Sequence, residues 1–246
     1  MTASETREEF NLRYNNALEG APGLDTFEIS SYLTVAQEQL IKTYYDATKD
    51  PTSSFERHEK ARRILNELVK DEKITSPISS ERGLVDESSF YELSNNAMYI
   101  VLETATLVGK SNPAISNKVI KVVPITHDEF MISYRNPFRK PNANKAWRVD
   151  ISKENSKTTV EIVSDKEIKM YNVRYISYPS PIIVEDLKLA TDVAGLGLSI
   201  QGQTAEAACK LSELAHREII NIAVENAVLD YRESTLQGRM GLDSRV

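Results

Sequence analysis

Residues 98–108 read MYIVLETATLV, and this stretch decides how the chain is divided. It is rich in β-branched and aromatic residues, which favour a strand. The segments at the two ends of the chain have their apolar residues at helical spacing instead. The hydrophobic period therefore changes from about 3.6 residues to two and back, which predicts an α+β protein.

Further strands are predicted on the C-terminal side of this stretch, at 119–123, 146–151, 158–163 and 173–178. Residues 146–151 (AWRVDI) alternate with period two, as half-buried strands do. Thr126 to Glu129 (THDE) has the spacing of a capping box and predicts a short helix through Tyr134. Pro179 closes the last strand, because proline cannot donate to a sheet ladder.

Three helices are predicted before the strands. The first covers 4–19, and the second starts at Asp25 and ends at Asp50-Pro51. The apolar stripe of the second helix is formed by Ile29, Leu33, Ala36, Leu40 and Tyr44. The third follows a capping box at 53–56 and buries a stripe that ends at Val69. Residues 74–90, rich in serine, are predicted to be a loop.

A long C-terminal helix is predicted over 204–235, and Gly238 and Gly241 are expected to end it. Its apolar stripe needs a partner, and the N-terminal helices need one too. The predicted fold is therefore a helical body built from the N- and C-terminal helices, residues 1–96 and 204–246. A β-rich middle domain, 97–178, is inserted into it, and 179–203 is a linking loop.

Composition excludes several classes of function. The chain has 246 residues, a net charge of −6 and one cysteine, so neither an intramolecular disulfide nor a Cys-based zinc site is expected. Its polar N-terminus and the absence of a long apolar run predict neither a secretory signal nor a membrane span. No phosphate-binding glycine loop is present. The three histidines, His58, His127 and His216, lack helical metal-site spacing. We therefore predict no catalytic, cofactor or metal site, and no enzyme.

The segment 134–148 (YRNPFRKPNANKAWR) is the strongest candidate for a binding surface. All its charged residues are cations, it has three aromatic residues, and two prolines hold it extended. The candidate interface residues are Arg135, Phe138, Arg139, Lys140, Lys145, Trp147 and Arg148. Arginine with aromatic residues is typical of protein interfaces, and the acidic chain as a whole disfavours nucleic acid. A protein contact is the leading interpretation, in which Arg139 or Trp147 is buried against another chain; a nucleic-acid contact and a solvated connection remain open.

The tail, 236–246, offers a second, smaller candidate surface. It keeps Arg239, Met240 and Leu242 among polar and small residues. A partner chain would order such a segment, because its contacts with the segment offset the conformational entropy that the segment loses on ordering. Plain disorder is the alternative.

Several phrases of the sequence resemble a family of virion proteins from tailed phages that infect Bacteroidetes, the crAss-like phages among them. They are EFNLRYNN (9–16), EISSYLTVAQE (28–38), FERHEKARR (55–63), THDEF (126–130) with NPFRKPN (136–142), VRYI (173–176) with PIIVEDL (181–187), and CKL (209–211) with HREII (216–220) and AVE (223–225). The family is similar in plan to head–tail connector or tail-adaptor ring proteins.

The resemblance implies a virion subunit at the head–tail junction or in the tail, assembled in the host cytoplasm. It implies a ring of roughly twelve copies, with the portal protein and neighbouring tail or ring proteins as partners, and no membrane. DNA would pass through the channel without sequence-specific binding, and an acidic wall suits that passage because phosphates are repelled. The basic segment of one subunit would then meet an acidic helix of the next. A phage-encoded binding or packaging factor outside the virion is the alternative function.

Overall fold

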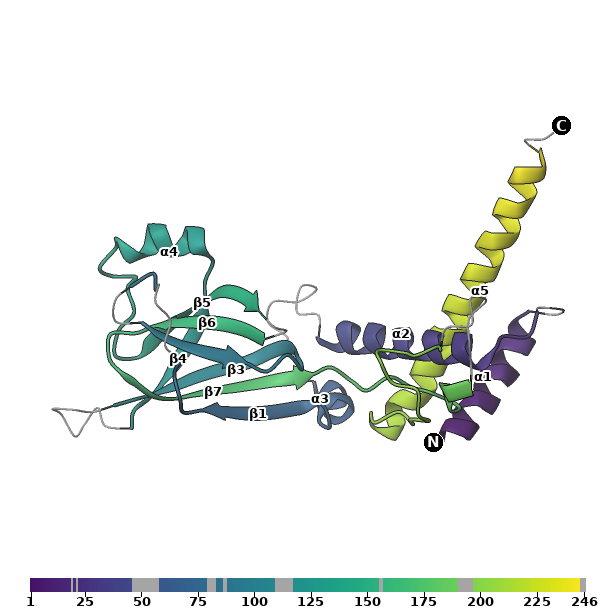
Figure 1. The fold of residues 1–246 in the computed structure, drawn as a ribbon, viewed down its shortest axis with the longest axis horizontal. Coiled ribbons are helices and arrows are strands. Elements are labelled where there is room, and N and C mark those ends of the chain that lie inside the picture. The colour runs from purple at the N-terminus through teal and green to yellow at the C-terminus, as the bar shows by residue number, and fades with distance from the viewer. Residues whose placement is uncertain are drawn as a thin grey trace. The chain divides into compact units, whose positions relative to one another are not determined.

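The computed structural model describes residues 1–18, 20, 22–45, 58–78, 83–85, 88–108, 117–154, 157–189 and 197–243; within 152–154, 157, 189 and 234–243 it describes the backbone alone. The fold is mixed α+β, with five α-helices and a seven-stranded sheet in the described residues (Figure 1). The chain divides into two compact units, Met1–Leu68 with Pro179–Val246, and Val69–Tyr178. We call them the helical unit and the sheet unit, and describe each by itself.

In its described residues the sheet unit contains all seven strands and one helix. The strands are β1 (Val69–Ile74), β2 (Ser89–Leu93), β3 (Ala97–Leu107), β4 (Val119–Pro124), β5 (Lys145–Glu154), β6 (Lys157–Val163) and β7 (Ile168–Ser177). Their order in the sheet is β1-β7-β3-β4-β5-β6-β2. All neighbours are antiparallel except β4 and β5, which are parallel and joined through helix α4 (His127–Tyr134). A helical crossover is the usual connection between parallel neighbours.

Two apolar clusters hold the sheet unit together, one for each face of β5. The larger includes Ala146 and extends from β2 through β7, where the rings of Tyr91 and Tyr171 lie 5.3 Å apart. The smaller joins Trp147 and Val149 to Phe130 of α4. Alternate residues of β5 thus enter different clusters, as the two-residue period of a strand requires.

The helical unit is built from α1 (Ala3–Ala17), α2 (Thr26–Tyr45), α3 (Glu59–Leu65), a short 3-10 turn, η2 (Leu187–Leu189), and α5 (Glu213–Asp243). Helix α5 contacts α1 and α2. The apolar stripes of α2 and α5 meet here: Ile29 and Leu33 of α2 are buried, and so are Ile220 and Ala223 of α5. Helix α1 begins with a capping box in which Thr2 accepts from the Glu5 amide.

Two buried hydroxyl groups attach the returning chain to α2. The Ile182 amide donates to Thr34 Oγ1 over 3.1 Å, and the Val184 amide donates to Ser30 Oγ over 3.1 Å. Each hydroxyl also donates to a carbonyl one turn earlier in its own helix. These side chains provide acceptors for backbone amides that follow the end of β7 and have no partner in a neighbouring strand.

We expect Thr34→Val to lower the free energy of unfolding by about 1–3 kcal/mol, because it leaves the buried Ile182 amide without an acceptor while keeping the side-chain shape. Denaturant titration followed by circular dichroism measures the change. Thr43→Val is the control, since the Thr43 hydroxyl is exposed and donates to Gln39 within α2. Equal losses in the two variants would contradict the role given to Thr34.

The predicted strands at 98–108, 119–123, 146–151, 158–163 and 173–178 are confirmed, as is the short helix after Thr126. The prediction was wrong at Val69, which begins strand β1 and does not end a helix, and at residues 74 and 89–90, which belong to β1 and β2 and not to a loop. Residues 69–93 therefore supply two strands to the sheet and are not part of a helical body. The capping box expected at 53–56 lies outside the described residues.

The C-terminal helix also differs from its prediction. It starts at Glu213 and not at 204, because Ala207 exchanges two backbone hydrogen bonds of 2.9 Å with Ile183, which holds it extended. Its backbone stays helical past Gly238 and Gly241 to Asp243. The expected stop at those glycines was therefore wrong. Among the described residues, no helix has the length and apolar content to cross a bilayer.

Candidate protein–protein interface

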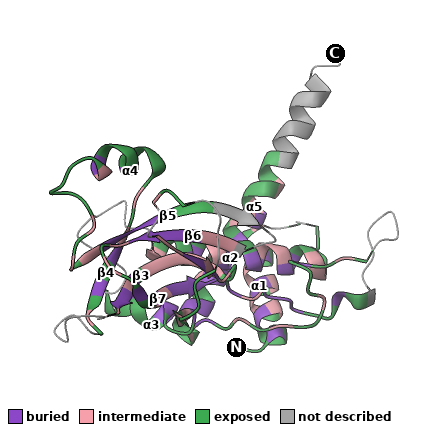
Figure 2. Cartoon of the chain, turned by 60° about the vertical axis from the view of Figure 1, so that its left-hand side comes forward, coloured by how far each residue is buried: buried purple, intermediate pink, exposed green. Residues whose placement is uncertain are grey.

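Helix α4 and the turn after it expose large apolar side chains. Thr126 caps the helix by accepting from the Glu129 amide. Phe130 is buried and meets the Trp147 ring edge-on. The opposite face exposes 65% of Met131 and 72% of Ile132, and Figure 2 colours most of α4 as exposed. Single exposed apolar residues are ordinary, but adjacent ones rimmed by polar groups mark interaction sites.

The turn that follows α4 projects Phe138 into solvent. Asn136 Oδ1 accepts from the Phe138 amide over 3.0 Å, and the Asn136 carbonyl accepts from the amides of Arg139 and Lys140. This turn leaves Phe138 95% exposed. Asparagine commonly fixes a turn in this way, because its side-chain oxygen accepts a hydrogen bond from the backbone amide two residues later.

Cations surround these apolar side chains. Arg135, Arg139 and Lys140 are all exposed, and the Lys140 ammonium lies 4.6 Å from the centre of the Tyr134 ring. We call the set Met131, Ile132, Arg135, Phe138, Arg139 and Lys140 the α4 knob. It combines apolar side chains with positive charge, which is the composition of an interface hot spot.

The remaining residues predicted for this surface lie elsewhere. Trp147 is buried beneath α4, and Arg148 is buried on the other face of β5, so neither is available to another chain. Lys145 is half-buried, with its ammonium 5.9 Å from the Trp147 ring centre. The prediction named Arg139 or Trp147 as the residue buried against a partner. Trp147 does not fit that role, because the strand period that begins at Ala146 directs it under α4, and for Arg139 the contact stays a prediction. The side chains of Arg239, Met240 and Leu242 lie outside the described residues.

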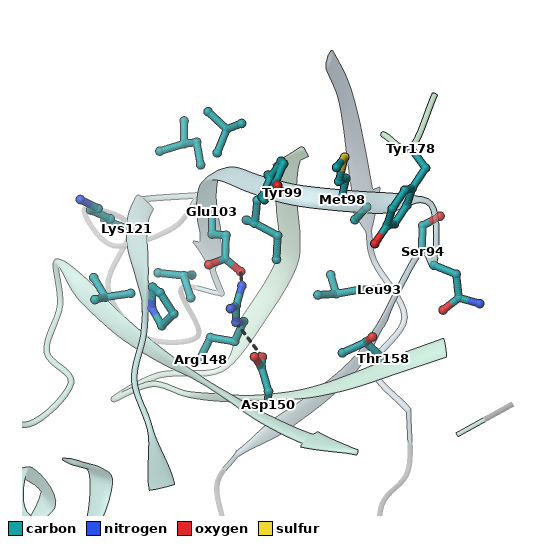
Figure 3. A pocket seen from close by; sticks show the side chains of 18 residues that line it. Leu93, Ser94, Met98, Tyr99, Glu103, Lys121, Arg148, Asp150, Thr158 and Tyr178 are labelled. Atoms are coloured by element: carbon teal, nitrogen blue, oxygen red, sulfur yellow. Dashed lines mark ion pairs between the residues drawn. The ribbon is translucent and has the colours of Figure 1, made fainter. Parts of the chain in front are cut away.

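A buried ionic cluster occupies the position where Arg148 was expected to be exposed. Its Nη1 lies 2.8 Å from Glu103 Oε1 and its Nε 2.9 Å from Asp150 Oδ1 (Figure 3). The Tyr171 hydroxyl donates to the same Glu103 carboxylate. Burial and then the Glu103 charge raise the pKa of Tyr171 well above its usual range. Burial disfavours the charged Arg148 guanidinium, but the Glu103 carboxylate outweighs it and raises the pKa of Arg148.

Glu103, Arg148 and Asp150 line a hollow of about 570 Å³ in the sheet unit. Figure 3 shows Glu103, Arg148 and Asp150 side by side, with Tyr99 next to Glu103 and Tyr178 farther away, near Met98. The buried Glu103 carboxylate and the Arg148 guanidinium neutralise each other, and Asp150 contacts Arg148 from a largely exposed position. The geometry therefore indicates a structural ion pair that joins β3 to β5. Sequence reasoning missed Glu103, although a single acid within an apolar strand is a signal that it needs a buried partner.

A second surface, in the helical unit, was also missed. Helices α1 and α5 form a groove of about 950 Å³ that is lined by Met1, Glu5, Glu8, Glu9, Leu12, Glu213, Leu214 and Arg217. Leu12 is 63% exposed and Leu214 57% exposed. We call this set the α1/α5 groove. Sequence analysis treated the two helices separately, so their acids did not appear as one surface.

Two side chains of the helical unit that could be chemically reactive, Cys209 and His216, are in structural environments. Burial raises the pKa of the Cys209 thiol to about 11, so almost no thiolate is present near neutral pH. His216 is buried, with Nε2 2.8 Å from the Leu211 carbonyl oxygen. Within the part of the chain that the structure describes, no three histidine, cysteine or acidic side chains gather as metal ligands do.

Comparison with known proteins gives consistent results over the whole chain. Residues 1–238 match the family model described as phage tail ring protein 3/4. The chain is 33% identical over 213 residues to "Ring protein 3" of Bacteroides phage crAss001, covering 86% of this chain and 88% of that protein. It is 27% identical over 249 residues to "Ring protein 4/5" of the same phage, covering 100% and 99%.

Proposed function

The chain belongs to the phage tail ring protein 3/4 family and is a structural ring subunit of a phage virion, and we propose that its ring belongs to the portal–tail connector. In this proposal roughly twelve copies close by rotation around a channel. The portal protein and other ring or tail proteins are the axial partners. Assembly takes place in the host cytoplasm, and the ring is then part of the virion.

The observation that carries this proposal is the alignment of one chain with two different ring proteins of a single phage. Such a family builds more than one ring on one plan, as a connector made of stacked rings requires. The helical unit, which joins the two ends of the chain, is proposed as the ring wall. The sheet unit is proposed as an inserted domain that makes lateral contacts.

DNA passage fits the charge of the chain. A net charge of −6 disfavours tight contact with phosphates. If basic side chains of the channel wall neutralised several phosphates, the affinity of the wall for DNA would rise about 10³–10⁵-fold as the salt concentration falls. Such binding would stop the DNA from sliding through the channel. We therefore propose that the DNA contacts are not sequence-specific and that the channel surface is acidic.

Counting the subunits tests this proposal directly. Electron microscopy of the virion, with an antibody or tag on this chain, gives the position and rotational symmetry of its ring. A closed ring between portal and tail is the expected result. The absence of the chain from purified particles would overturn the proposal and favour an assembly factor outside the virion.

The tail provides a prediction about the same assembly. Deleting 237–246 removes Arg239, Met240 and Leu242, none of which belongs to the apolar stripe of the last helix, which runs from Ile220 to Tyr231. We expect the melting temperature of the isolated subunit to change by less than about 2 °C, while incorporation into particles falls. Differential scanning calorimetry and quantitative mass spectrometry of particles provide the two measurements. Undiminished incorporation would remove the tail from the assembly mechanism.

A further inference from the structure

We propose that the α4 knob of one subunit docks in the α1/α5 groove of the next copy in the ring. This inference rests on the proposed function, because it names the contact through which neighbouring subunits join. The inference adds the surface that receives the α4 knob, and it assigns both surfaces of the contact to named residues.

The two surfaces match in apolar content. The α4 knob presents Met131, Ile132 and Phe138, and Phe138 is almost fully exposed. The α1/α5 groove is concave and exposes Leu12 and Leu214 along its walls. An exposed aromatic side chain that enters a hollow lined by leucines is a common anchor of protein interfaces.

The two surfaces also match in charge. The α4 knob has three cations, Arg135, Arg139 and Lys140, whereas the groove has four glutamates against one arginine and the Met1 ammonium. Two of these glutamates are engaged within α1: Glu5 accepts from the Thr2 amide, and Glu9 pairs with Arg13. Within the described part of the chain, Glu8 and Glu213 make no ion pair, and both are exposed. They are the acids available to the arginines of a neighbour.

The groove between α2 and α5 is a weaker receptor. It encloses about 550 Å³ and has acids too. However, Glu28 accepts from the Asp25 amide over 2.9 Å, and Asp230 accepts from the Tyr32 hydroxyl over 2.9 Å. Two of its three acids therefore already hold hydrogen bonds within the subunit.

A contact between these surfaces has the symmetry that a ring needs. The α4 knob is on the sheet unit and the groove is on the helical unit, so the two sides differ. A contact between unlike surfaces leaves one of each free after two copies join. Further copies then add until the rotation closes, whereas a contact between like surfaces ends at a dimer.

Charge reversal on each side provides the test. The knob variant is Arg135→Glu with Arg139→Glu, and the groove variant is Glu8→Lys with Glu213→Lys. The control variant, Glu225→Lys with Glu233→Lys, makes the same charge change at exposed positions of α5 outside the α1/α5 groove. Each is supplied to cells infected by a phage that lacks this gene, and subunits per purified particle are counted by mass spectrometry. Thermal unfolding of each purified variant confirms that it folds.

We expect the knob and groove variants each to lower incorporation by at least ~10-fold, because like charges then face each other, and the control to stay within ~2-fold of wild type. A chain with all four reversals has a negative knob and a positive groove, so its incorporation should return to within ~3-fold of wild type. The knob and groove variants should also assemble when mixed, as alternating subunits of an even-numbered ring.

Three outcomes would overturn the inference. Failure of the fourfold reversal to recover incorporation would mean that the knob and groove do not meet. Loss in the knob variant alone would identify a different partner for the knob. Loss in the control equal to that in the groove variant would point to the α2/α5 groove or to net charge. Failure of the wild-type chain to enter particles would instead refute the proposed function, so the two failures are distinguishable.

Discussion

Arg148→Met is expected to lower the free energy of unfolding of the sheet unit by about 3–5 kcal/mol. The change leaves the buried Glu103 carboxylate without the cation 2.8 Å away. Methionine replaces the volume of the side chain, so the loss reports the unpaired charge rather than a cavity. Trp147 is the only tryptophan of the chain and lies in the sheet unit, so its fluorescence in a denaturant titration measures the effect.

Two further variants distinguish the contribution of the Glu103–Arg148 ion pair to stability from that of the neighbouring groups. Asp150→Asn removes the other acid that contacts Arg148, but that side chain is 62% exposed, so the expected loss is below about 1 kcal/mol. Glu103→Leu combined with Arg148→Met removes both buried charges and should recover most of the stability. If the single variant Arg148→Met has the same free energy of unfolding as Asp150→Asn, the buried Glu103 carboxylate does not need the Arg148 cation for stability.

Replacing Met131, Ile132 and Phe138 together by serine is expected to abolish ring incorporation while leaving the subunit folded. These side chains make no core contact that folding needs, because each is at least 65% exposed. In an interface, burying each one contributes about 1.5–3 kcal/mol. Losing all three is therefore expected to weaken the contact by at least ~10³-fold.

The matched control is Val119→Ser, an apolar side chain of the same unit that is 61% exposed and outside the α4 knob. It should leave incorporation and unfolding unchanged. The measurements are subunits per particle and the fluorescence-detected unfolding midpoint of each purified variant. Normal incorporation of the triple variant would exclude α4 as a contact, and a lowered unfolding midpoint would show that its apolar face serves the fold.

Prediction from sequence succeeded where a segment's own pattern decided its structure. The stretch 98–108 is a strand because its residue types favour one, and Thr126 begins a helix because its hydroxyl caps the first turn. It failed at Val69–Ile74, whose charged residues suit the exposed edge position that β1 takes beside β7. Nothing local in VKDEKI indicates that a partner strand will come from residues 171–176.

The division of the basic segment illustrates the same limit. Sequence identified its cations and aromatic residues as a surface, and for Arg135, Phe138, Arg139 and Lys140 the structure does leave them exposed. Trp147 and Arg148 instead became core residues, because β5 begins just before them and pairs with β4 and β6. Strand pairing, which depends on residues far along the chain, decides which side of a segment faces water.

The sequence by itself therefore determined most of the strands and helices, the absence of recognisable catalytic motifs and the family resemblance, since these depend on residue type and spacing along the chain. Only the tertiary structure decided that Glu103 and Arg148 form a buried pair, that α5 starts at Glu213, and that acids from α1 and α5 line one groove. The physical reason is that periodicity shows which face of an element is apolar, but not which distant element covers it. That choice is made by long-range packing and hydrogen bonding, as between Ala207 and Ile183.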